Sequence, residues 1–387
     1  MNDAIQNVSG DAIWDLARSR ENEVSRIQRI ENTSLARFKG HWYSAFREAA
    51  THNNHPTGRT RVIRSATGQD WETVALFDWD SADVRDANLS ITGEGWLLLN
   101  ASVYYLSPEP RGQVRRGPTG ALESYTPPEG LDPDDGLTHY YHLDWIGTIL
   151  NVSPDDFEPN ASCESITWLT SDGVNWSSAY SCPTGVNTCR FDVTWHNGMG
   201  YSLAQWGKDC RGPLYRTRDG KRWRILTDRC APDGKCNEGS LAFGTDETAY
   251  CLLRGPGSAG VSLGVGEAPY YQNWKWTEPT VNYGLGYSGL SAQEAFRVSL
   301  GGPKILRLSD GRLVGAGRAL GPGREDGRVT LFWIDPGNAV FDIFAECDGT
   351  GYPGVVEHEG ELWVTYTGKG CHGGRWDVSL AKVKVPA

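Results

Sequence analysis

Long apolar stretches, methionine and helical periodicity are all scarce in this chain of 387 residues. No apolar run approaches the ~20 residues that a transmembrane helix needs, so we expect no membrane contact. Only 2 methionines and no sustained 3.6-residue apolar repeat occur, which argues against a helical protein. The chain begins without the apolar core of a signal peptide, so we expect a mature chain with an added Met.

Motifs of several cofactor and enzyme classes are also missing. The sequence has no CxxC pair with zinc spacing, no phosphate-binding P-loop and no Gly-x-Ser-x-Gly nucleophile turn. The Gly-x-Gly-x-x-Gly letters of residues 284–289 open no helix, so they predict a turn. The acidic cluster Asp132, Asp134 and Asp135 is better explained as a loop cap than as a calcium site. We therefore expect neither a metal ion nor a cofactor.

Basic residues are fewer than acidic ones. The chain has 37 Lys and Arg and 48 Asp and Glu, which gives a net charge of −11. Nucleic acid binding needs a basic face, so this balance argues against a nucleic acid partner. An acidic ligand would have to be held by local arginines, because the field of the whole molecule does not attract it.

Glycine and aromatic residues are abundant instead, with 47 Gly, 16 Trp and 16 Tyr. Apolar stretches of four to seven residues alternate with Gly, Asp, Asn and Pro, which predicts short β-strands. We predict an all-β protein with one domain over residues 36–387. A lead-in over residues 1–35 could close that domain by pairing with its last strand. The Pro- and Gly-rich segment 107–135, with three arginines, is either a lid or a surface loop.

A turn motif recurs between pairs of these strands. Residues 64–74, 170–179 and 217–226 share Ser or Thr, then Asp or Thr, then Gly, with a Trp three residues later. Asp or Thr would cap turn amides, Gly would take a positive φ, and Trp would cover the hairpin base. The motif resembles the Asp-box, allowing for one residue's difference in loop length. Repeated hairpins predict a β-propeller, and about 40–50 residues per blade favour seven blades, with six as the alternative.

Cysteines and glycosylation sequons suggest the compartment. Seven of the nine cysteines lie between Cys163 and Cys251. Seven Asn-x-Ser/Thr sequons begin at Asn7, Asn32, Asn88, Asn100, Asn151, Asn160 and Asn175. Together they favour a secreted, glycosylated protein with disulfides. Proximity in the sequence suggests the bridges Cys182–Cys189, Cys230–Cys236 and Cys347–Cys371.

Three similar strands end in arginine. Residues 240–254 predict a hairpin, with Glu238 before its first strand and Arg254 at the end of its second. The sequence LRLSDGRLVGAGR repeats this plan and ends at Arg318, while HWYSAFR is a single strand that ends at Arg47. In a radial arrangement these ends converge, so we predict that the three arginines form one pocket for a carboxylate.

The order and spacing of these groups resemble the sialidase superfamily of β-propellers over most of the chain. The arginine of FREA matches the first arginine of that family, and Glu238 lies 16 residues before Arg254. Arg318 follows 64 residues later, and Tyr352 follows 34 residues after that. The resemblance implies that the arginines grip the carboxylate of an acidic sugar while Tyr352 is the nucleophile and Glu238 its partner. We also expect the arginines to depress the pKa of Tyr352.

One loop departs from that family. The family supplies an acid/base Asp soon after the first arginine, but the loop here has His52 and His55 and no carboxylate. The next acidic cluster offers Asp83, Arg85 and Asp86, so one of its carboxylates could stand in as the acid, and Arg85 and Asp86 could help to bind the substrate.

Histidines suggest a different reaction. His139 and His142 flank a pair of tyrosines, and His196 follows a Trp. In β-elimination from a uronate, arginines neutralise the carboxylate, and a histidine or Tyr352 removes the acidified proton and protonates the leaving oxygen. The chain also resembles secreted fungal propeller lyases that cut rhamnose–glucuronate linkages.

Three hypotheses follow for a monomer whose partner is an acidic glycan. The first is a secreted polysaccharide lyase that uses Tyr352 or a histidine as base and acid. The second is an exo-sialidase-type glycoside hydrolase, with Asp83 or Asp86 as its acid. The third is a non-catalytic glycan-binding propeller that keeps the arginine pocket.

Overall fold

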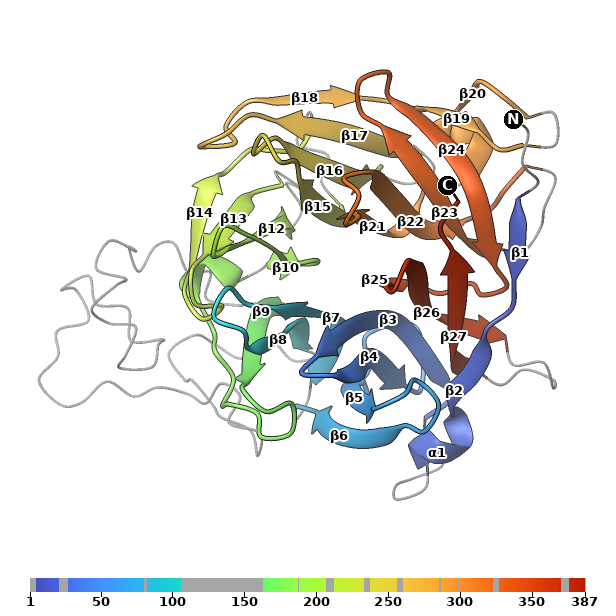
Figure 1. The fold of residues 1–387 in the computed structure, drawn as a ribbon. Coiled ribbons are helices and arrows are strands. Elements are labelled where there is room, and N and C mark those ends of the chain that lie inside the picture. Colours follow the sequence, from blue (N-terminus) through green and yellow to red (C-terminus); the bar gives the residue numbers. More distant parts are fainter. Residues whose placement is uncertain are drawn as a thin grey trace, which may run out of the picture.

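The computed structural model describes residues 5–20, 27–79, 82–105, 163–186, 188–206, 212–232, 237–255, 260–284, 287–297, 299–322, 327–369 and 376–386. These residues form six β-sheets arranged around a central axis, so the prediction of an all-β propeller is confirmed (Figure 1). The segment 107–135, His139 and His142 lie outside the described residues.

The first three sheets come from the N-terminal half. The first sheet contains β3 (Arg29–Phe38), β4 (His41–Ala49), β5 (Arg59–Ser65) and β6 (Glu72–Phe77). The second contains β7 (Ala82–Ile91), β8 (Leu97–Tyr105) and β9 (Cys163–Thr170). The third contains β10 (Thr188–Arg190), β11 (Thr194–His196), β12 (Met199–Trp206), β13 (Leu214–Thr217) and β14 (Trp223–Thr227). Consecutive strands within these sheets pair antiparallel, as a chain of short hairpins should.

The other three sheets continue in the same sense around the axis (Figure 1). The fourth contains β15 (Gly239–Phe243), β16 (Ala249–Arg254), β17 (Val261–Gly266) and β18 (Trp274–Thr277). The fifth contains β21 (Gly301–Arg307), β22 (Leu313–Ala319), β23 (Arg328–Asp335) and β24 (Val340–Cys347), extended by β19 (Thr280–Asn282), β20 (Leu290–Ser291) and β1 (Gln6–Val8). The sixth contains β25 (Gly354–His358), β26 (Glu361–Lys369), β27 (Trp376–Lys384) and β2 (Asp11–Asp15). The short helices are α1 (Leu16–Arg20), η2 (Pro183–Gly185) and α3 (Ala292–Phe296).

The number of blades differs from the prediction. Five of the sheets have the four or more strands of a complete blade, and the sheet β7–β8–β9 has three within the described residues. The favoured seven blades are therefore wrong, and six complete blades are not found either. The prediction divided the chain evenly among blades, whereas residues 106–162 lie between β8 and β9, which are neighbours in one sheet.

The N-terminal segment takes part in two sheets. β2 pairs antiparallel with β27, so strands from the two ends of the chain share the sixth sheet. β1 pairs parallel with β24 on the outside of the fifth sheet. These pairings tie the first residues to the last blades and close the ring of sheets.

The repeated turn motif forms the predicted capped turns. In the third copy, Asp219 Oδ1 accepts hydrogen bonds from the backbone amides of Lys221 and Arg222, at 2.9 and 2.8 Å. Gly220 has a φ of +73°, which glycine tolerates without strain. The indole of Trp223 donates to the Gly220 carbonyl at 3.2 Å and so covers the base of the hairpin. The predicted role of each residue in this motif is confirmed.

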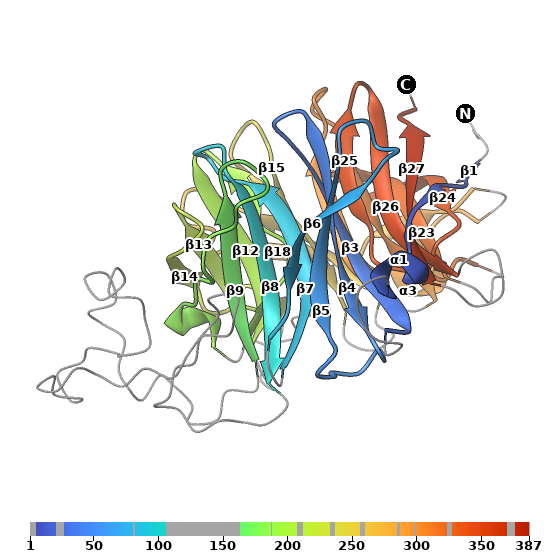
Figure 2. The ribbon, with the colours of Figure 1, turned by 90° about the horizontal axis from the view of Figure 1, so that it is seen from below.

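Adjacent sheets pack against one another face to face. Val62, Leu99 and Ile166 are fully buried in a cluster that joins the first and second sheets. Leu331 and Val364 do the same between the fifth and sixth sheets. Figure 2 shows the sheets edge-on, with the strands of neighbouring sheets side by side. This packing fixes the inner ends of the strands, from which the site is built.

One of the predicted disulfide bridges is absent from the described residues. Cys182 and Cys189 are free and buried, so the predicted bridge between them is wrong. Cys182 contacts the Trp223 carbonyl at 3.3 Å, whereas Cys189 accepts a hydrogen bond from the Ser102 hydroxyl at 2.8 Å. Their closeness in the sequence therefore does not bring the two sulfur atoms together. Cys236 and Cys371, the partners in the other two predicted bridges, lie outside the described residues.

The sequons do not all face solvent. The side chains of Asn88 and Asn100 are buried, and the Asn100 amide donates to the Arg190 carbonyl. These two asparagines cannot carry glycans in the folded protein. Of the described helices, none combines the length and the apolarity that crossing a bilayer requires.

Candidate functional site

A cleft of about 860 Å³ opens where strand ends and loops of all six sheets meet. Its charged, polar and aromatic lining includes Arg29, Glu31, Asn32, His52, Arg85, Asp86, Tyr104, Glu238, Arg254, Arg318 and Tyr352. The predicted convergence is thus confirmed for Arg254 and Arg318. The radial arrangement produces it, because each arginine ends the second strand of its sheet.

Glu238, Arg254 and Tyr352 form a compact cluster within the cleft. The backbone amide of Arg254 donates to the Glu238 carbonyl, so the β15–β16 hairpin places the two side chains together. The Tyr352 hydroxyl donates to Glu238 Oε1 at 2.6 Å, and Arg254 Nη1 donates to the Tyr352 oxygen at 2.7 Å. The same guanidinium nitrogen lies 2.6 Å from Glu238 Oε1. A tyrosine, its proton acceptor and a cation are therefore in mutual contact.

The backbone around this cluster holds the tyrosine and the glutamate in place. Thr33 of β3 donates from its amide and its hydroxyl to the Tyr352 carbonyl, at 3.1 and 2.8 Å. The Gly302 amide donates to Glu238 Oε2 at 2.7 Å, which leaves Oε1 for the tyrosine. Ser299 accepts a hydrogen bond from Arg254 Nε at 2.8 Å. Three blades thus orient one phenol–carboxylate pair.

The pKa of Tyr352 is raised well above its ordinary value of 10.0, which overturns the expectation that the arginines depress it. Burial is the largest cause, and the negative charge of Glu238 adds to it. Arg254 and Arg318 lower the pKa, but by less. The resting pair is therefore a neutral phenol beside a carboxylate that can accept its proton.

Arg318 is the second arginine that faces the cleft. Its guanidinium carbon lies 5.0 Å from the centre of the Tyr352 ring, a cation–π contact. Within the described part of the chain, its nitrogens donate no hydrogen bond to a protein group. This fork is therefore available to a ligand carboxylate next to the tyrosine.

Arg47 does not join the other two arginines. Its side chain is 0% exposed, and it donates to Asp83 through Nε at 2.9 Å and to Glu31 through Nη1 at 2.8 Å. The carbonyls of Thr51 and Asn53 accept its remaining hydrogen bonds, because the loop after β4 folds over it. Arg47 does not line the cleft, and the hydrogen bonds of its side chain go to groups of the protein, so this structure gives no support to the prediction that it binds substrate.

Two further arginines, Arg29 and Arg85, line the cleft, and Arg29 was not predicted. It begins β3, lines the cleft, and its Nε donates to Glu31 Oε1 at 2.8 Å. The sequence analysis missed this residue because it treated residues 1–35 as a lead-in. The alternation of Arg29, Ile30 and Glu31 was the available signal, since it is typical of a strand with one buried face.

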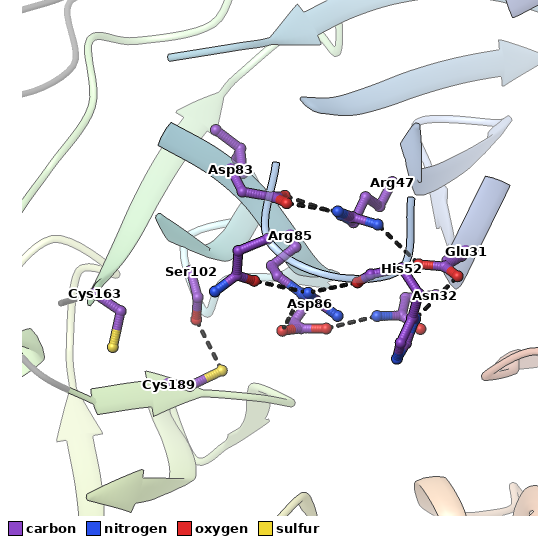
Figure 3. Close-up of polar contacts among 12 residues, drawn as sticks. Glu31, Asn32, Arg47, His52, Asp83, Arg85, Asp86, Ser102, Cys163 and Cys189 are labelled. Carbon is purple, nitrogen blue, oxygen red and sulfur yellow. Dashed lines mark hydrogen bonds and ion pairs between the residues drawn. The ribbon is translucent and has the colours of Figure 1, made fainter. Parts of the chain in front are cut away.

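The two acidic residues of β7 lie in different surroundings, one buried and one in the cleft. Asp83 is 0% exposed and is held by Arg47, so it cannot reach a substrate. Asp86 lines the cleft, where its carboxylate accepts a hydrogen bond from Asn32 at 2.6 Å and pairs with Arg85 at 3.3 Å (Figure 3). Burial lowers the pKa of Arg85, but the charges of Asp86 and Asp83 outweigh burial and raise it.

Two facing β-bulges present this polar edge. Asn32 and Asp86 have φ values of +55° and +57°, which are uncommon for residues other than glycine. Each lies where the strand register shifts, in β3 and in β7. A bulge turns a side chain away from the sheet, so both side chains point into the cleft. The sequence analysis named Asp86 but missed Asn32, because a bulge has no signature in this sequence.

Two of the predicted histidines that the structure describes lie in different places. His196 stacks on Phe243 with ring centres 4.5 Å apart, bonds to Asn197 and does not line the cleft. The predicted role of His196 in this cleft therefore has no support in the structure, where it lies at the end of the short hairpin β11–β12. His52 does line the cleft, and its Nδ1 lies 3.0 Å from Glu31 Oε1 (Figure 3). Among the described residues, no group of three or more His, Cys, Asp or Glu could hold a metal ion.

A smaller cavity adjoins the cleft and shares Asp86, Glu238 and Tyr352 with it. Lys304 lines this cavity and pairs with Asp192 at 2.8 Å. This ion pair joins β21 to the loop after β10, across the axis of the propeller. The sequence analysis did not single out either residue, because nothing in their local sequence indicates that they meet.

Comparison with known proteins supports the fold. No protein-family model and no curated protein matches the sequence. The structure is similar to the intramolecular trans-sialidase from Ruminococcus gnavus, solved with oseltamivir carboxylate, with a TM-score of 0.61, 11% identity and coverage of 97% of each chain. It is also similar to the NanB sialidase from Streptococcus pneumoniae, with a TM-score of 0.60, 9% identity and coverage of 97% of this chain and 70% of that one.

A third similar structure is a protein of unknown function from Dyadobacter fermentans. Its TM-score is 0.59 and its identity 14%, over 96% of this chain and 97% of that one. Identities this low show a shared fold and no more. The chain therefore has a sialidase-like β-propeller fold, which the spacing of its arginines and Asp-box turns indicated.

Proposed function

We propose that this protein is a glycoside hydrolase of the sialidase type, which removes a terminal sugar that bears a carboxylate. The observation that carries the proposal is the contact of Tyr352 with both Glu238 and Arg254 inside the cleft. The similarity to sialidase structures supports it at the level of the fold. The hydrolase, second among the hypotheses from the sequence, thus has better support than the lyase.

The proposed nucleophile suits a negatively charged substrate. A carboxylate on the anomeric carbon would repel a carboxylate nucleophile, whereas a neutral phenol can approach it. As the Tyr352 oxygen bonds to that carbon, its proton passes to Glu238 Oε1, 2.6 Å away. Arg254 Nη1 stabilises the negative charge that develops on the phenol oxygen.

Arginines would hold the substrate carboxylate. Arg318 offers its guanidinium beside the tyrosine ring, and Arg254 has a second terminal nitrogen beyond the one that contacts Tyr352. Arg29 enters from the opposite sheet. Guanidinium forks bind carboxylates with two parallel hydrogen bonds, which orients the sugar as well as neutralising it.

The lyase and the binding module remain as outcomes of the test. The protein is incubated with a sialoside and, in parallel, with a glucuronate-rich plant gum. Free sialic acid is measured in the first, and the ultraviolet absorbance of a 4,5-unsaturated uronate in the second. We expect sialic acid and no rise in absorbance. A rise without sialic acid would establish the lyase, and binding without either product would establish a lectin.

Variants connect the activity to the site. We expect Tyr352→Phe to lower kcat/KM by about 10³-fold or more while a carboxylate ligand still binds, because the nucleophile is lost and the arginines remain. Tyr283→Phe is the matched control, since Tyr283 also donates to a buried glutamate, Glu346, but does not line the cleft. Equal effects of the two substitutions would show that Tyr352 acts only through stability.

A further inference from the structure

The loop between β4 and β5 brings a histidine into the cleft. His52 lines the cleft, and its side chain is 63% exposed. One ring nitrogen, Nδ1, lies 3.0 Å from Glu31 Oε1 (Figure 3). Of the described residues that line the cleft, His52 is the only histidine.

Glu31 is a rigid partner for this histidine. Its carboxylate is largely buried and also accepts hydrogen bonds from Arg47 and Arg29, each at 2.8 Å. Three partners from β3, β4 and the following loop hold it in one orientation. A carboxylate on Nδ1 selects the tautomer with a proton there. The other ring nitrogen, Nε2, is then the one that can exchange a proton in the cleft.

The carboxylates among the described lining residues all have arginine partners. They are three: Glu31 pairs with Arg29 and Arg47, Asp86 with Arg85, and Glu238 with Arg254. Each of these carboxylates is therefore already occupied by a guanidinium. A hydrolase that protonates its leaving group needs a different acid, and His52 is placed to be one.

We propose that the Glu31–His52 pair is the general acid and base of this site, with His52 exchanging the proton and Glu31 positioning it. The assignment rests on the proposed function, a hydrolase with Tyr352 as nucleophile. In this assignment His52 takes the role of the acid that was predicted from the sequence to be Asp83 or Asp86.

The proposed reaction has two steps, after which each protein group is back in its original protonation state. In the first, the bond from the Tyr352 oxygen to the anomeric carbon forms, the bond to the leaving oxygen breaks, and His52 Nε2 gives that oxygen its proton. Glu238 holds the tyrosine proton meanwhile. In the second, neutral His52 takes a proton from the water that attacks the anomeric carbon. The bond to Tyr352 breaks, Glu238 returns the proton to the phenol, and the imidazolium is restored.

Several charged groups surround His52. Glu31 contacts its ring, and Arg29 and Arg47 bind the same carboxylate. Arg85 Nη1 donates to the His52 carbonyl at 3.2 Å and brings a further positive charge, which Asp86 partly neutralises. The pair acts as an acid only while the imidazolium persists, so kcat/KM should have an alkaline limb that depends on His52.

Leaving groups of different acidity test the assignment. A 4-nitrophenyl sialoside needs little protonation of its leaving oxygen, whereas sialyllactose needs it fully. We expect His52→Ala to lower kcat/KM for sialyllactose by about 10²- to 10⁴-fold, and for the aryl glycoside by about tenfold or less. The alkaline limb for sialyllactose should disappear. Equal losses on both substrates, or no loss on either, would overturn the proposal.

Two control variants sharpen the result. His55→Ala alters the same loop, but His55 bonds to Thr57 at 2.8 Å and does not line the cleft, so both rates should be kept. Asp86→Asn tests the rival acid. If Asp86→Asn shows the selective loss on sialyllactose and His52→Ala does not, then the acid is Asp86.

A measurement that needs no turnover tests the Glu31–His52 pair independently of the hydrolase proposal. Nitrogen-15 NMR of histidine-labelled protein reports which ring nitrogen of neutral His52 carries the proton, with His52→Ala assigning the signal. We expect the proton on Nδ1, and a proton on Nε2 overturns the pair. If wild-type protein cleaves neither sialoside, the hydrolase proposal fails and the catalytic role fails with it. If only His52→Ala is without effect, the hydrolase stands and the pair fails.

Discussion

Arg47 and Arg254 lie at or near the ends of equivalent strands, β4 and β16, yet their surroundings differ. The loop after β4 covers Arg47, whose hydrogen bonds go to Asp83, Glu31 and two loop carbonyls. Arg254 is partly exposed and contacts the tyrosine of the cleft. An arginine near a strand end is thus buried where a loop and two carboxylates enclose it, and accessible where the cleft opens.

Removal of Arg47 should destabilise the fold. Arg47→Met would leave the carboxylates of Asp83 and Glu31 without their main partner, which costs about 3–5 kcal/mol for a buried ion pair. Arg64→Met is the control, because Arg64 pairs with the exposed Glu72 and should cost about 1 kcal/mol or less. Urea denaturation measures both. If Arg47→Met weakened ligand binding but left stability unchanged, the original assignment of Arg47 to substrate would return.

At the scale of elements, bulges in three strands shape the cleft. Register shifts in β3 and β7 place Asn32 and Asp86 at its edge, and one in β21 places Gly302 in the smaller adjoining cavity. Gly302 has a φ of +56°, and its amide holds Glu238. A methyl group on Gly302 would lie 2.3 Å from the Tyr352 ring, closer than atoms can approach. The bulge in β21 therefore sets the position of the tyrosine.

Gly302→Ala should consequently impair catalysis more than folding. The new methyl group would displace Tyr352 from Glu238 and Arg254, and a shift of about 1 Å can lower kcat by about 10²-fold. Gly360→Ala provides the control, since Gly360 also has a positive φ, +78°, but a methyl group there meets nothing within 4 Å. Both variants carry backbone strain, and Gly302→Ala adds the clash with Tyr352, so its melting temperature should fall further, whereas kcat should fall only in Gly302→Ala. Steady-state kinetics would contradict the idea if both variants kept full kcat.

The whole molecule depends on closure of the ring of sheets. β2 pairs with β27, and β1 pairs with β24, so the N-terminal residues are integral to the last two sheets. Apolar faces between the sheets form the core, and the cleft lies where the inner strand ends converge. The cleft can therefore keep its shape only while the ring is closed, which couples the site to global stability.

Global stability should fall at alkaline pH. The folded protein raises the pKa of Tyr352 above 10.0 and that of Cys347 to about 12, both chiefly through burial. The folded state holds these protons more tightly than the unfolded chain. The contribution of these two groups to stability is therefore complete below their pKa values in the unfolded chain. It is lost as pH rises from those values through the higher pKa values of the folded protein.

Denaturation by urea at about pH 9 and about pH 11 measures this loss. Tyr352→Phe should fall less steeply than wild type over that interval, because one group with a raised pKa is removed. Tyr283→Phe would show whether any buried tyrosine has the same effect. An unchanged slope for Tyr352→Phe would mean that Tyr352 titrates normally in the folded protein.

Much of the fold was predictable because it depends on local sequence. Alternating apolar residues specified the strands, and the Gly–Trp turns specified their pairing as hairpins. The hairpin from Gly239 to Arg254 agrees with its prediction, since its register follows from a short turn. Blade number was not predictable, because residues 106–162 lie between two strands of a single sheet.

The site was predictable only where it lies on regular strands. Glu238, Arg254, Arg318 and Tyr352 meet as their spacing indicated. The role of Arg47 was misjudged because enclosure by a loop has no local signature. Arg29 and Asn32 were missed because β3 was treated as a lead-in and because a bulge does not show in the sequence.

The sequence by itself therefore determined the strands, their hairpins and the radial repeat, since these follow from side-chain alternation and turn chemistry within a few residues. Only the tertiary structure decided which arginines line the cleft, that the pKa of Tyr352 is raised, and that His52 meets Glu31. Burial and the distances between charges decide those properties. Both arise from residues far apart in the chain, which become neighbours only when the ring of sheets closes.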